Sequence, residues 1–184
     1  QAAVRYEDYS DFGEKVVWKV ASRYAVSDEF ALRGSVGTGF RAPTPGQQGT
    51  TNVSTRLPEG FPVATGLFPA GGVVAQALGA KELKPETSTN FAAGFTLDLG
   101  DLNITVDGYQ IEIEDRVYAT STQDVSTNPT AGAAYDNYQA LVSAGVSGAE
   151  SIGGVFFFQN AFDTVTRGID VVATYTIDFG FQGS

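Results

Sequence analysis

Carboxylates are the residues in this 184-residue chain with the most potential for chemistry, and the densest group is Glu112, Glu114 and Asp115. Glu112 and Glu114 stand two residues apart in a segment that alternates like a β-strand, so they would share a face and could act as a paired acid–base site. A hydrated strand face or rim is the simpler interpretation. The chain contains no Cys and no His, which excludes thiol nucleophiles, imidazole bases and zinc–cysteine sites within it. We therefore predict no catalytic residue and no enzyme activity.

Cofactor and metal sites have little support in the sequence. Gly37 and Gly39 could approach a phosphate, but they lie inside a predicted strand with no Lys after them, whereas a phosphate loop joins a strand to a helix. Oxygen ligands are plentiful without the spacing of a calcium loop, so calcium at a loop rim stays an open alternative and we predict no metal site or cofactor. The 21 Asp and Glu residues outnumber 11 Lys and Arg, which argues against nucleic acid as a partner.

Polar and aromatic side chains in the long segments between predicted strands are the better candidates for binding. Aromatic faces beside amide groups suit a sugar, a chelate or a planar cofactor. The alternatives are that the aromatic residues pack the loops together, that the run 156–158 begins the next strand, and that Arg41 holds the base of its loop. The residues predicted to contact a small-molecule ligand are Arg41, Gln47, Gln48, Tyr135, Tyr138, Gln159 and Asn160.

Period-two alternation defines the elements that would position these residues. In 30–40, large apolar residues alternate with Ala, Arg, Ser and Gly, which is typical of a strand with one apolar and one polar face. In 102–118 the alternation goes out of phase, which predicts a bulge at Gly108. A short helix is plausible within 131–144. About six strands are predicted in all, at about 2–9, 16–25, 30–40, 87–99, 102–118 and 162–179.

The connections between these strands are of two kinds that alternate along the chain. Residues 27–29 and 100–101 have the composition of tight turns. Longer loops are predicted at about 10–15, 41–86 and 119–161, so every long loop would lie at the same end of the strands. Loops of about forty residues are usually functional rather than simple connections.

Two architectures place one apolar and one polar face on each strand. A soluble sandwich buries the apolar face, whereas a transmembrane barrel turns it towards lipid and lines its lumen with small polar residues. The long strands, the Gly-, Ala-, Ser- and Thr-rich polar faces and the loop asymmetry favour the barrel. Arg23 and Arg33 fall on the polar face, as a barrel requires, because Arg at mid-depth on the lipid face would cost roughly 2 to 4 kcal/mol.

Four segments carry a resemblance to a known family. Residues 32–43 read Leu-Arg-Gly-Ser-Val-Gly-Thr-Gly-Phe-Arg-Ala-Pro, and residues 83–86 read Leu-Lys-Pro-Glu. Val-Asp-Gly-Tyr-Gln-Ile-Glu-Ile at 106–113 and Thr-Arg-Gly-Ile-Asp at 166–170 follow in order. Together they strongly resemble the C-terminal part of the barrel of TonB-dependent outer-membrane receptors. One departure is that the family usually carries a Glu two residues before the Gly that is Gly94 here, and this chain has Ala92.

The resemblance implies an all-β fold in which this chain is an antiparallel transmembrane β-barrel segment, about six strands of a 22-stranded barrel with long extracellular loops. It implies a bacterial outer-membrane location in contact with lipid, and a partner plug domain and TonB-contacting segment outside these 184 residues. The implied function is active uptake of a scarce nutrient, such as siderophore-iron, cobalamin or an oligosaccharide. A passive porin, a surface-binding barrel and a secreted sandwich enzyme stay as alternatives.

Overall fold

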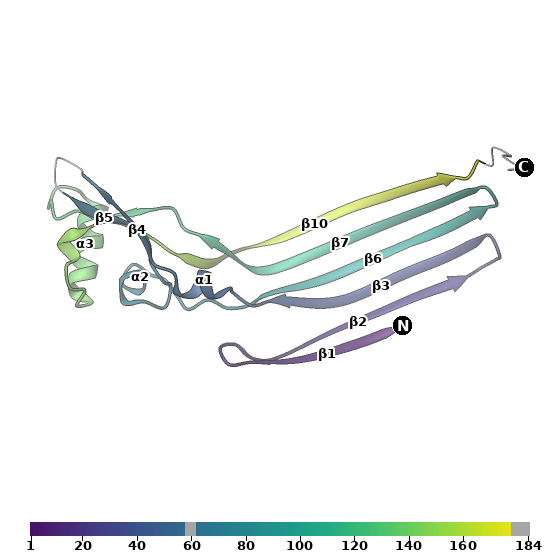
Figure 1. Ribbon diagram of the computed structural model, residues 1–184, viewed down its shortest axis with the longest axis horizontal. Helices are drawn as coiled ribbons and strands as arrows, with labels where there is room; N and C mark the ends of the chain where they lie inside the picture. Colours follow the sequence, from purple (N-terminus) through teal and green to yellow (C-terminus); the bar gives the residue numbers. More distant parts are fainter. Residues whose placement is uncertain (58–61, 178–184) are drawn as a thin grey trace, which may run out of the picture. The chain divides into compact units, whose positions relative to one another are not determined.

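In a computed structural model, residues 1–57 and 62–177 are described, and the chain divides into two compact units (Figure 1). The sheet unit comprises Gln1–Phe40, Thr87–Glu114 and Asp163–Ser184, and the loop unit comprises Arg41–Glu86 and Asp115–Phe162. The described residues include no helix that is long and apolar enough to cross a membrane.

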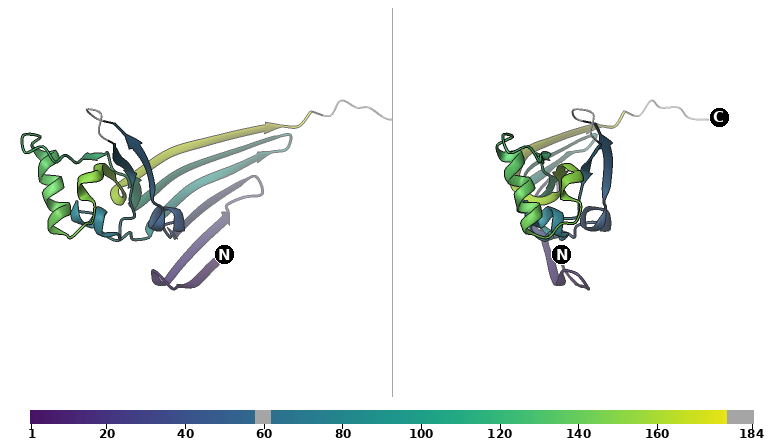
Figure 2. Two further views of the ribbon diagram at one scale, coloured as in Figure 1. Left: turned by 60° about the vertical axis from the view of Figure 1, so that its left-hand side comes forward. Right: turned by 90° about the vertical axis from the view of Figure 1, so that its left-hand side faces the viewer.

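Six long strands form one sheet, and they overlap the six ranges expected from the alternation. Figures 1 and 2 show them side by side in a single layer, in the order β1-β2-β3-β6-β7-β10. The pairings of β1 with β2, β2 with β3 and β6 with β7 are antiparallel, so the prediction of an all-β fold with mostly antiparallel strands is confirmed. The described sheet is open, with β1 and β10 at its edges. The strands are β1 (Ala2–Tyr9), β2 (Gly13–Ala25), β3 (Phe30–Arg41), β6 (Glu86–Leu99), β7 (Leu102–Ala119) and β10 (Phe158–Tyr175).

The bounds of β2 and β10 differ by more than one residue from the expected ones. β2 begins at Gly13, whose φ of 65° allows a tight reversal after β1, so residues 13–15 are strand rather than loop. β10 begins at Phe158, which places the end of the run 156–158 at a strand start. β10 ends at Tyr175, so residues 176–177 of the last predicted strand are not strand, and residues 178–179 lie outside the described residues. The other two reversals follow the turn chemistry expected, because Ser27 Oγ accepts from the N–H groups of Glu29 and Phe30, and Gly100 has a φ of 75°.

The bulge predicted at Gly108 is wrong. The pairing of β6 with β7 runs without offset from Thr87 opposite Glu114 to Leu99 opposite Leu102. In a regular strand, Val106 and Gln110 share one face while Tyr109 and Ile111 lie on the other. The change of phase in the sequence therefore records a switch of the apolar residues between the faces of an unbroken strand. A backbone irregularity occurs instead at Asp115, whose φ of 55° is the one positive value at a non-glycine residue within the described chain.

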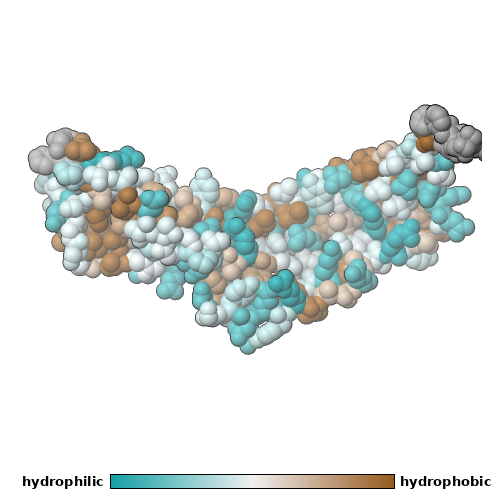
Figure 3. Space-filling view, in the orientation of Figure 1, coloured by the Kyte–Doolittle hydropathy of each residue, from teal (hydrophilic) through white to brown (hydrophobic). Residues whose placement is uncertain are grey.

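Large apolar side chains remain exposed on the sheet unit. Ala31 is the only buried apolar residue of its described part. Hydrophobic side chains reach the surface along the strands (Figure 3), among them Val4, Trp18, Val20 and Ile169. The sheet thus has no hydrophobic core of its own, unlike one layer of a soluble sandwich, which would bury this face.

The two long segments predicted as loops fold together into the loop unit. They contribute strands to one four-stranded sheet of order β4-β5-β9-β8, in which β5 from the first segment pairs in parallel with β9 from the second. The elements of this unit are α1 (Pro45–Gly49), β4 (Asn52–Arg56), β5 (Val63–Leu67), α2 (Val73–Ala77), β8 (Gln123–Asp124), α3 (Ala133–Ser143), the 3-10 turn η2 (Ala149–Ser151) and β9 (Ile152–Phe156). α3 lies within the range 131–144 in which a helix was expected.

A hydrophobic core holds the loop unit together. Leu141 on α3, Val155 on β9 and Phe157 are its largest fully buried side chains, and they pack with Ala70, Ala75, Leu83 and Val125. Because the core draws residues from both long segments, each segment covers apolar surface that the other would expose to water. The two segments are therefore one folding unit rather than two separate loops.

Candidate ligand-binding site and its supports

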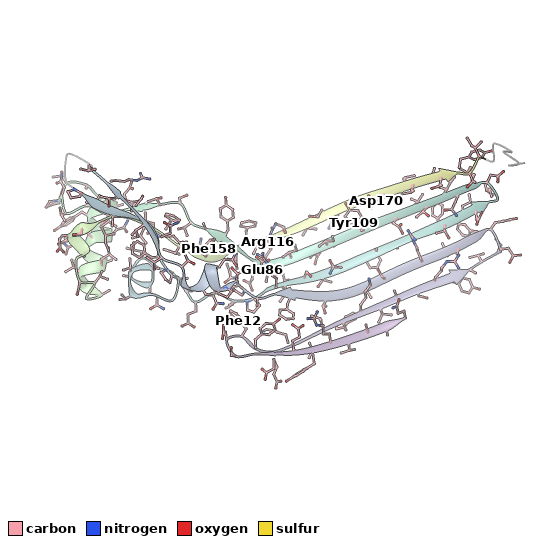
Figure 4. The ribbon with its side chains drawn as sticks, in the orientation of Figure 1. Phe12, Glu86, Tyr109, Arg116, Phe158 and Asp170 are labelled. Atoms are coloured by element: carbon pink, nitrogen blue, oxygen red, sulfur yellow. The ribbon has the colours of Figure 1, made fainter. Side chains whose placement is uncertain are left out.

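Arg41 and Glu86 form a two-bond ion pair at the base of the loop unit. Arg41 Nε donates to Glu86 Oε2 over 3.0 Å, and Arg41 Nη2 donates to Oε1 over 2.6 Å. The backbone N–H of Val117 donates to the same Oε1 over 2.8 Å. The Glu86 side chain, only 9% exposed, therefore connects the end of β3, the start of β6 and the end of β7. Figure 4 marks Glu86 with Arg116, whose positive charge also acts on it.

Glu86 stays ionised in this setting. Burial acts to raise the pKa of the Glu86 carboxyl, but the hydrogen bonds from Arg41 and Val117 and the charges of Arg41 and Arg116 outweigh it, so the pKa is lowered. The pair lies outside the predicted membrane strands 30–40 and 87–99. The arrangement supports the interpretation of Arg41 as the anchor of its loop.

Asn160 forms a second support with its side-chain amide. Its Oδ1 accepts from the N–H of Lys84 over 2.9 Å, and its Nδ2 donates to the carbonyls of Lys84 over 2.9 Å and Asp115 over 2.6 Å. One side chain therefore fixes the segment before β6 against Asp115, where the backbone of β7 has its positive φ.

A polar cavity of about 420 Å³ lies beside this support. Its walls bring two of the predicted ligand residues, Gln159 and Asn160, together with the charged side chains of Lys81, Glu82 and Lys84. Gln159 and both lysines are exposed. Ammonium donors beside an amide can bind carboxylate, hydroxyl or carbonyl oxygens of a polar ligand. This cavity is the candidate site for a small molecule.

The other predicted ligand residues lie elsewhere in the loop unit. Gln47 accepts from the N–H of Thr44 and completes a capping box at the start of α1, and Gln48 donates to the carbonyl of Pro43. Tyr135 and Tyr138 lie on α3 with ring centroids 6.1 Å apart, and Tyr138 packs against the hydrophobic core. A ligand role for these residues stays a prediction.

Several site residues were missed by the sequence reasoning. Lys81 carried no signal in the sequence, whereas Lys84 and Glu86 both stood in the Leu-Lys-Pro-Glu segment that carried the resemblance. The acidic group does not converge on one point, since Glu112 accepts from Gln110 over 2.6 Å and Glu114 from Thr87. Within residues 1–57 and 62–177, no three carboxylates gather as a metal site would require.

Two neighbouring amide residues at the cavity, Gln159 and Asn160, allow a matched test of which one supports the fold. Asn160→Asp replaces the donor Nδ2 with an oxygen that faces the carbonyls of Lys84 and Asp115, so we expect it to destabilise the loop unit by about 1 to 3 kcal/mol. Gln159→Glu makes the same chemical change on an exposed side chain and should leave stability unchanged. The stability of both variants is measured by unfolding the intact receptor in denaturant and monitoring protease cleavage within 62–86. Equal effects would contradict the assignment of Asn160 as the support.

The comparisons with known proteins identify the class of this chain. The model of the family "TonB dependent receptor-like, beta-barrel" matches residues 1–184. The chain therefore belongs to the TonB-dependent receptor β-barrel family, and the family expected from the four sequence segments is confirmed.

Its relatives are transporters and receptors. The vitamin B12 transporter BtuB of Photobacterium profundum is 28% identical over 130 residues, which are 71% of this chain and 17% of that protein. The siderophore receptor PirA from Acinetobacter baumannii shares the fold with a TM-score of 0.59 and 20% identity, over 96% of this chain and 23% of that one. A mutant of the ferric enterobactin receptor PfeA from Pseudomonas aeruginosa gives a TM-score of 0.62 and 15% identity, over 96% of this chain and 22% of that one. The chain thus spans less than a fifth of the curated relative and under a quarter of these structures.

Proposed function

We propose that this chain forms part of the barrel wall and ligand-binding loops of a receptor that takes up a scarce nutrient across the bacterial outer membrane. Its family membership over residues 1–184 carries the proposal. The exposed apolar side chains of the sheet unit support a barrel wall in contact with lipid, because a transmembrane barrel has its apolar band on the outside.

The proposed nutrient is a siderophore–iron complex, a cobalamin or an oligosaccharide. The names of the relatives, a vitamin B12 transporter, a siderophore receptor and a ferric enterobactin receptor, support the first two classes. The polar cavity beside Gln159 is the proposed contact of the loop unit with that nutrient. The loop unit would then be extracellular, and a plug domain and the TonB complex would be partners of the whole receptor.

A passive porin or a surface-binding barrel is the alternative. The deciding experiment expresses the intact receptor that contains this chain in a host without its own receptors, in the presence and absence of TonB. We expect accumulation of one labelled nutrient, from a panel of cobalamin, ferric siderophores and oligosaccharides, only when TonB is present. Uptake that is equal without TonB would support the passive barrel, and no uptake of any of them would count against the proposed nutrients.

Within that experiment, Lys81→Gln combined with Lys84→Gln tests the cavity. If the cavity binds the nutrient, the double variant should raise the half-saturating nutrient concentration about tenfold or more, the loss expected for one charged hydrogen bond. The amount of receptor in the membrane should stay unchanged. Arg56→Gln on β4, an exposed cation outside the cavity, is the matched control and should behave as the parent receptor.

A further inference from the structure

Cationic side chains gather on one face of β1, β2 and β3 although the chain is strongly acidic. The net charge is −10, yet six of the 11 Lys and Arg residues lie on these three strands. The register places Glu7 opposite Lys15, Arg5 opposite Val17 and Ala3 opposite Lys19, so the odd-numbered residues of β1 and β2 share a face. Ala21 opposite Ser35 and Arg23 opposite Arg33 extend that face to β3. Apart from Arg41 at the end of β3, which is paired with Glu86, the cations on this face are Arg5, Lys15, Lys19, Arg23 and Arg33.

Two carboxylates neutralise only part of this charge. Arg5 forms an ion pair with Glu7. Arg33 forms a two-bond pair with Asp107 of β7, with Nε 2.7 Å from Oδ1 and Nη2 bonded to Oδ2. Among the described residues, no ion pair involves Lys19 or Arg23. Lys19, Arg23, Arg33 and Asp107 together carry a net charge of about +2 at neutral pH.

The placement of Arg23 costs stability unless something compensates it. Arg23 and Arg33 are directly opposite on paired strands, where like charges repel because their Cβ atoms are only about 5 Å apart. The Asp107 carboxylate already takes two of the hydrogen bonds of Arg33. Arg33 has five N–H donors, so donors remain for another anion on the same face.

A hollow of about 220 Å³ lies beside these cations. Lys19 and Arg33 line it together with Ser35 of the same face and with small residues such as Ala21 and Ala92. Small residues here leave the space open, and the long cationic side chains form its walls. The hollow therefore combines space with positive charge that the described carboxylates do not fully balance.

We propose that this hollow binds a carboxylate group, which accepts hydrogen bonds from Lys19 and Arg33 and offsets the repulsion between Arg23 and Arg33. The carboxylate belongs either to an Asp or Glu side chain of another part of the receptor or to a small carboxylate that diffuses in. Both sources offer the same chemistry to the hollow, and the proposal holds for any nutrient.

The sign of a stability change tests the proposal. If the hollow stays empty, Arg23→Gln only removes like-charge repulsion and should raise the melting temperature of the intact receptor in detergent. If a carboxylate is bound, the same substitution should lower it, and Arg23→Lys should keep it near the parent value. Arg56→Gln, at an exposed cation of β4, is the control and should cause no change. A melting temperature that rises or stays unchanged in Arg23→Gln overturns the proposal.

Carbodiimide coupling then distinguishes the two sources. The reagent joins a contacting carboxylate to the Lys19 ammonium as an amide and takes up the water released. Mass spectrometry of the intact receptor should find Lys19 joined to an Asp or Glu of the receptor other than Asp107, which already lines the hollow, or to isotope-labelled propionate supplied as the probe. Lys19→Gln should abolish that product, and exposed Lys81 gives the background level. Lys19 coupling to neither source above the Lys81 level would contradict the proposal, and neither readout depends on nutrient uptake.

Discussion

Glu86→Ala is expected to destabilise the base of the loop unit by about 2 to 4 kcal/mol. The substitution removes both hydrogen bonds of Arg41 and the acceptor of the Val117 N–H. Most of the loss comes from the unpaired Val117 N–H and from the space that the buried side chain leaves, because the exposed Arg41 guanidinium can be solvated by water. The rate of protease cleavage within 62–86 of the intact receptor measures this local opening, and it should rise about 30-fold or more.

Two further variants separate the charge from the hydrogen bonds. Glu86→Gln keeps an oxygen that can accept from Val117 but loses the negative charge, so it should cause a smaller loss than Glu86→Ala. Glu82→Ala removes an exposed carboxylate four residues away and should leave the cleavage rate unchanged. An effect of Glu82→Ala as large as that of Glu86→Ala would show that the loss does not come from the contacts of Glu86 with Arg41 and Val117.

The same carboxylate gives the loop unit a dependence on pH. The pKa of Glu86 is lower in the folded chain than its ordinary value, so its ionisation stabilises the fold above the unfolded pKa of about 4.3. This contribution is lost as the pH falls from about 4.3 through the folded pKa. The difference in cleavage rate between the parent and Glu86→Gln should therefore shrink over that interval, whereas a constant difference would contradict the role of ionisation.

Gly94→Ala is expected to destabilise the six-stranded sheet by about 3 kcal/mol, the upper end of the range for overpacking. Gly94 lies directly opposite Asp107, and a Cβ there would overlap the carbonyl oxygen of Val106 and the Asp107 carboxylate. Neither the backbone nor the carboxylate held by Arg33 can move away without breaking an interaction. The temperature at which the receptor unfolds in detergent measures the effect.

Gly71→Ala is the matched control for that substitution. A Cβ at Gly71 meets no atom within 4 Å, so the same methyl group should have little effect there. If the two variants unfold at the same temperature, the close approach of β6 and β7 at Gly94 does not limit side-chain size.

The sheet could be predicted because its signal is local. Alternate residues of a strand lie on opposite faces of the sheet, so the apolar residues Leu32 and Val36 indicate their face without knowledge of any partner. The same rule failed at Gly108, because a switch of apolar residues between faces and an extra residue produce the same phase change in sequence. Only the pairing of Ala93 with Gly108 separates the two.

The loop unit could not be predicted because its signals are distant in sequence. Leu141 and Val155 bury themselves against residues of the earlier segment, and no periodicity within either segment reveals that contact. The cavity likewise depends on Asn160 holding Lys84, 76 positions away. The candidate amides Gln159 and Asn160 were found by residue type, but the lysines beside them are placed by the fold.

The parallel pairing of β5 with β9 constrains how this part of the receptor can diversify. Ala64 to Leu67 and Ile152 to Phe156 share one ladder, so an insertion in either segment must preserve the register of the other. A relative that exchanged only one of the two segments by recombination would have β5 or β9 without the strand that it pairs with. Chimeras intended to transfer specificity therefore need to carry 41–86 and 119–161 as a single cassette.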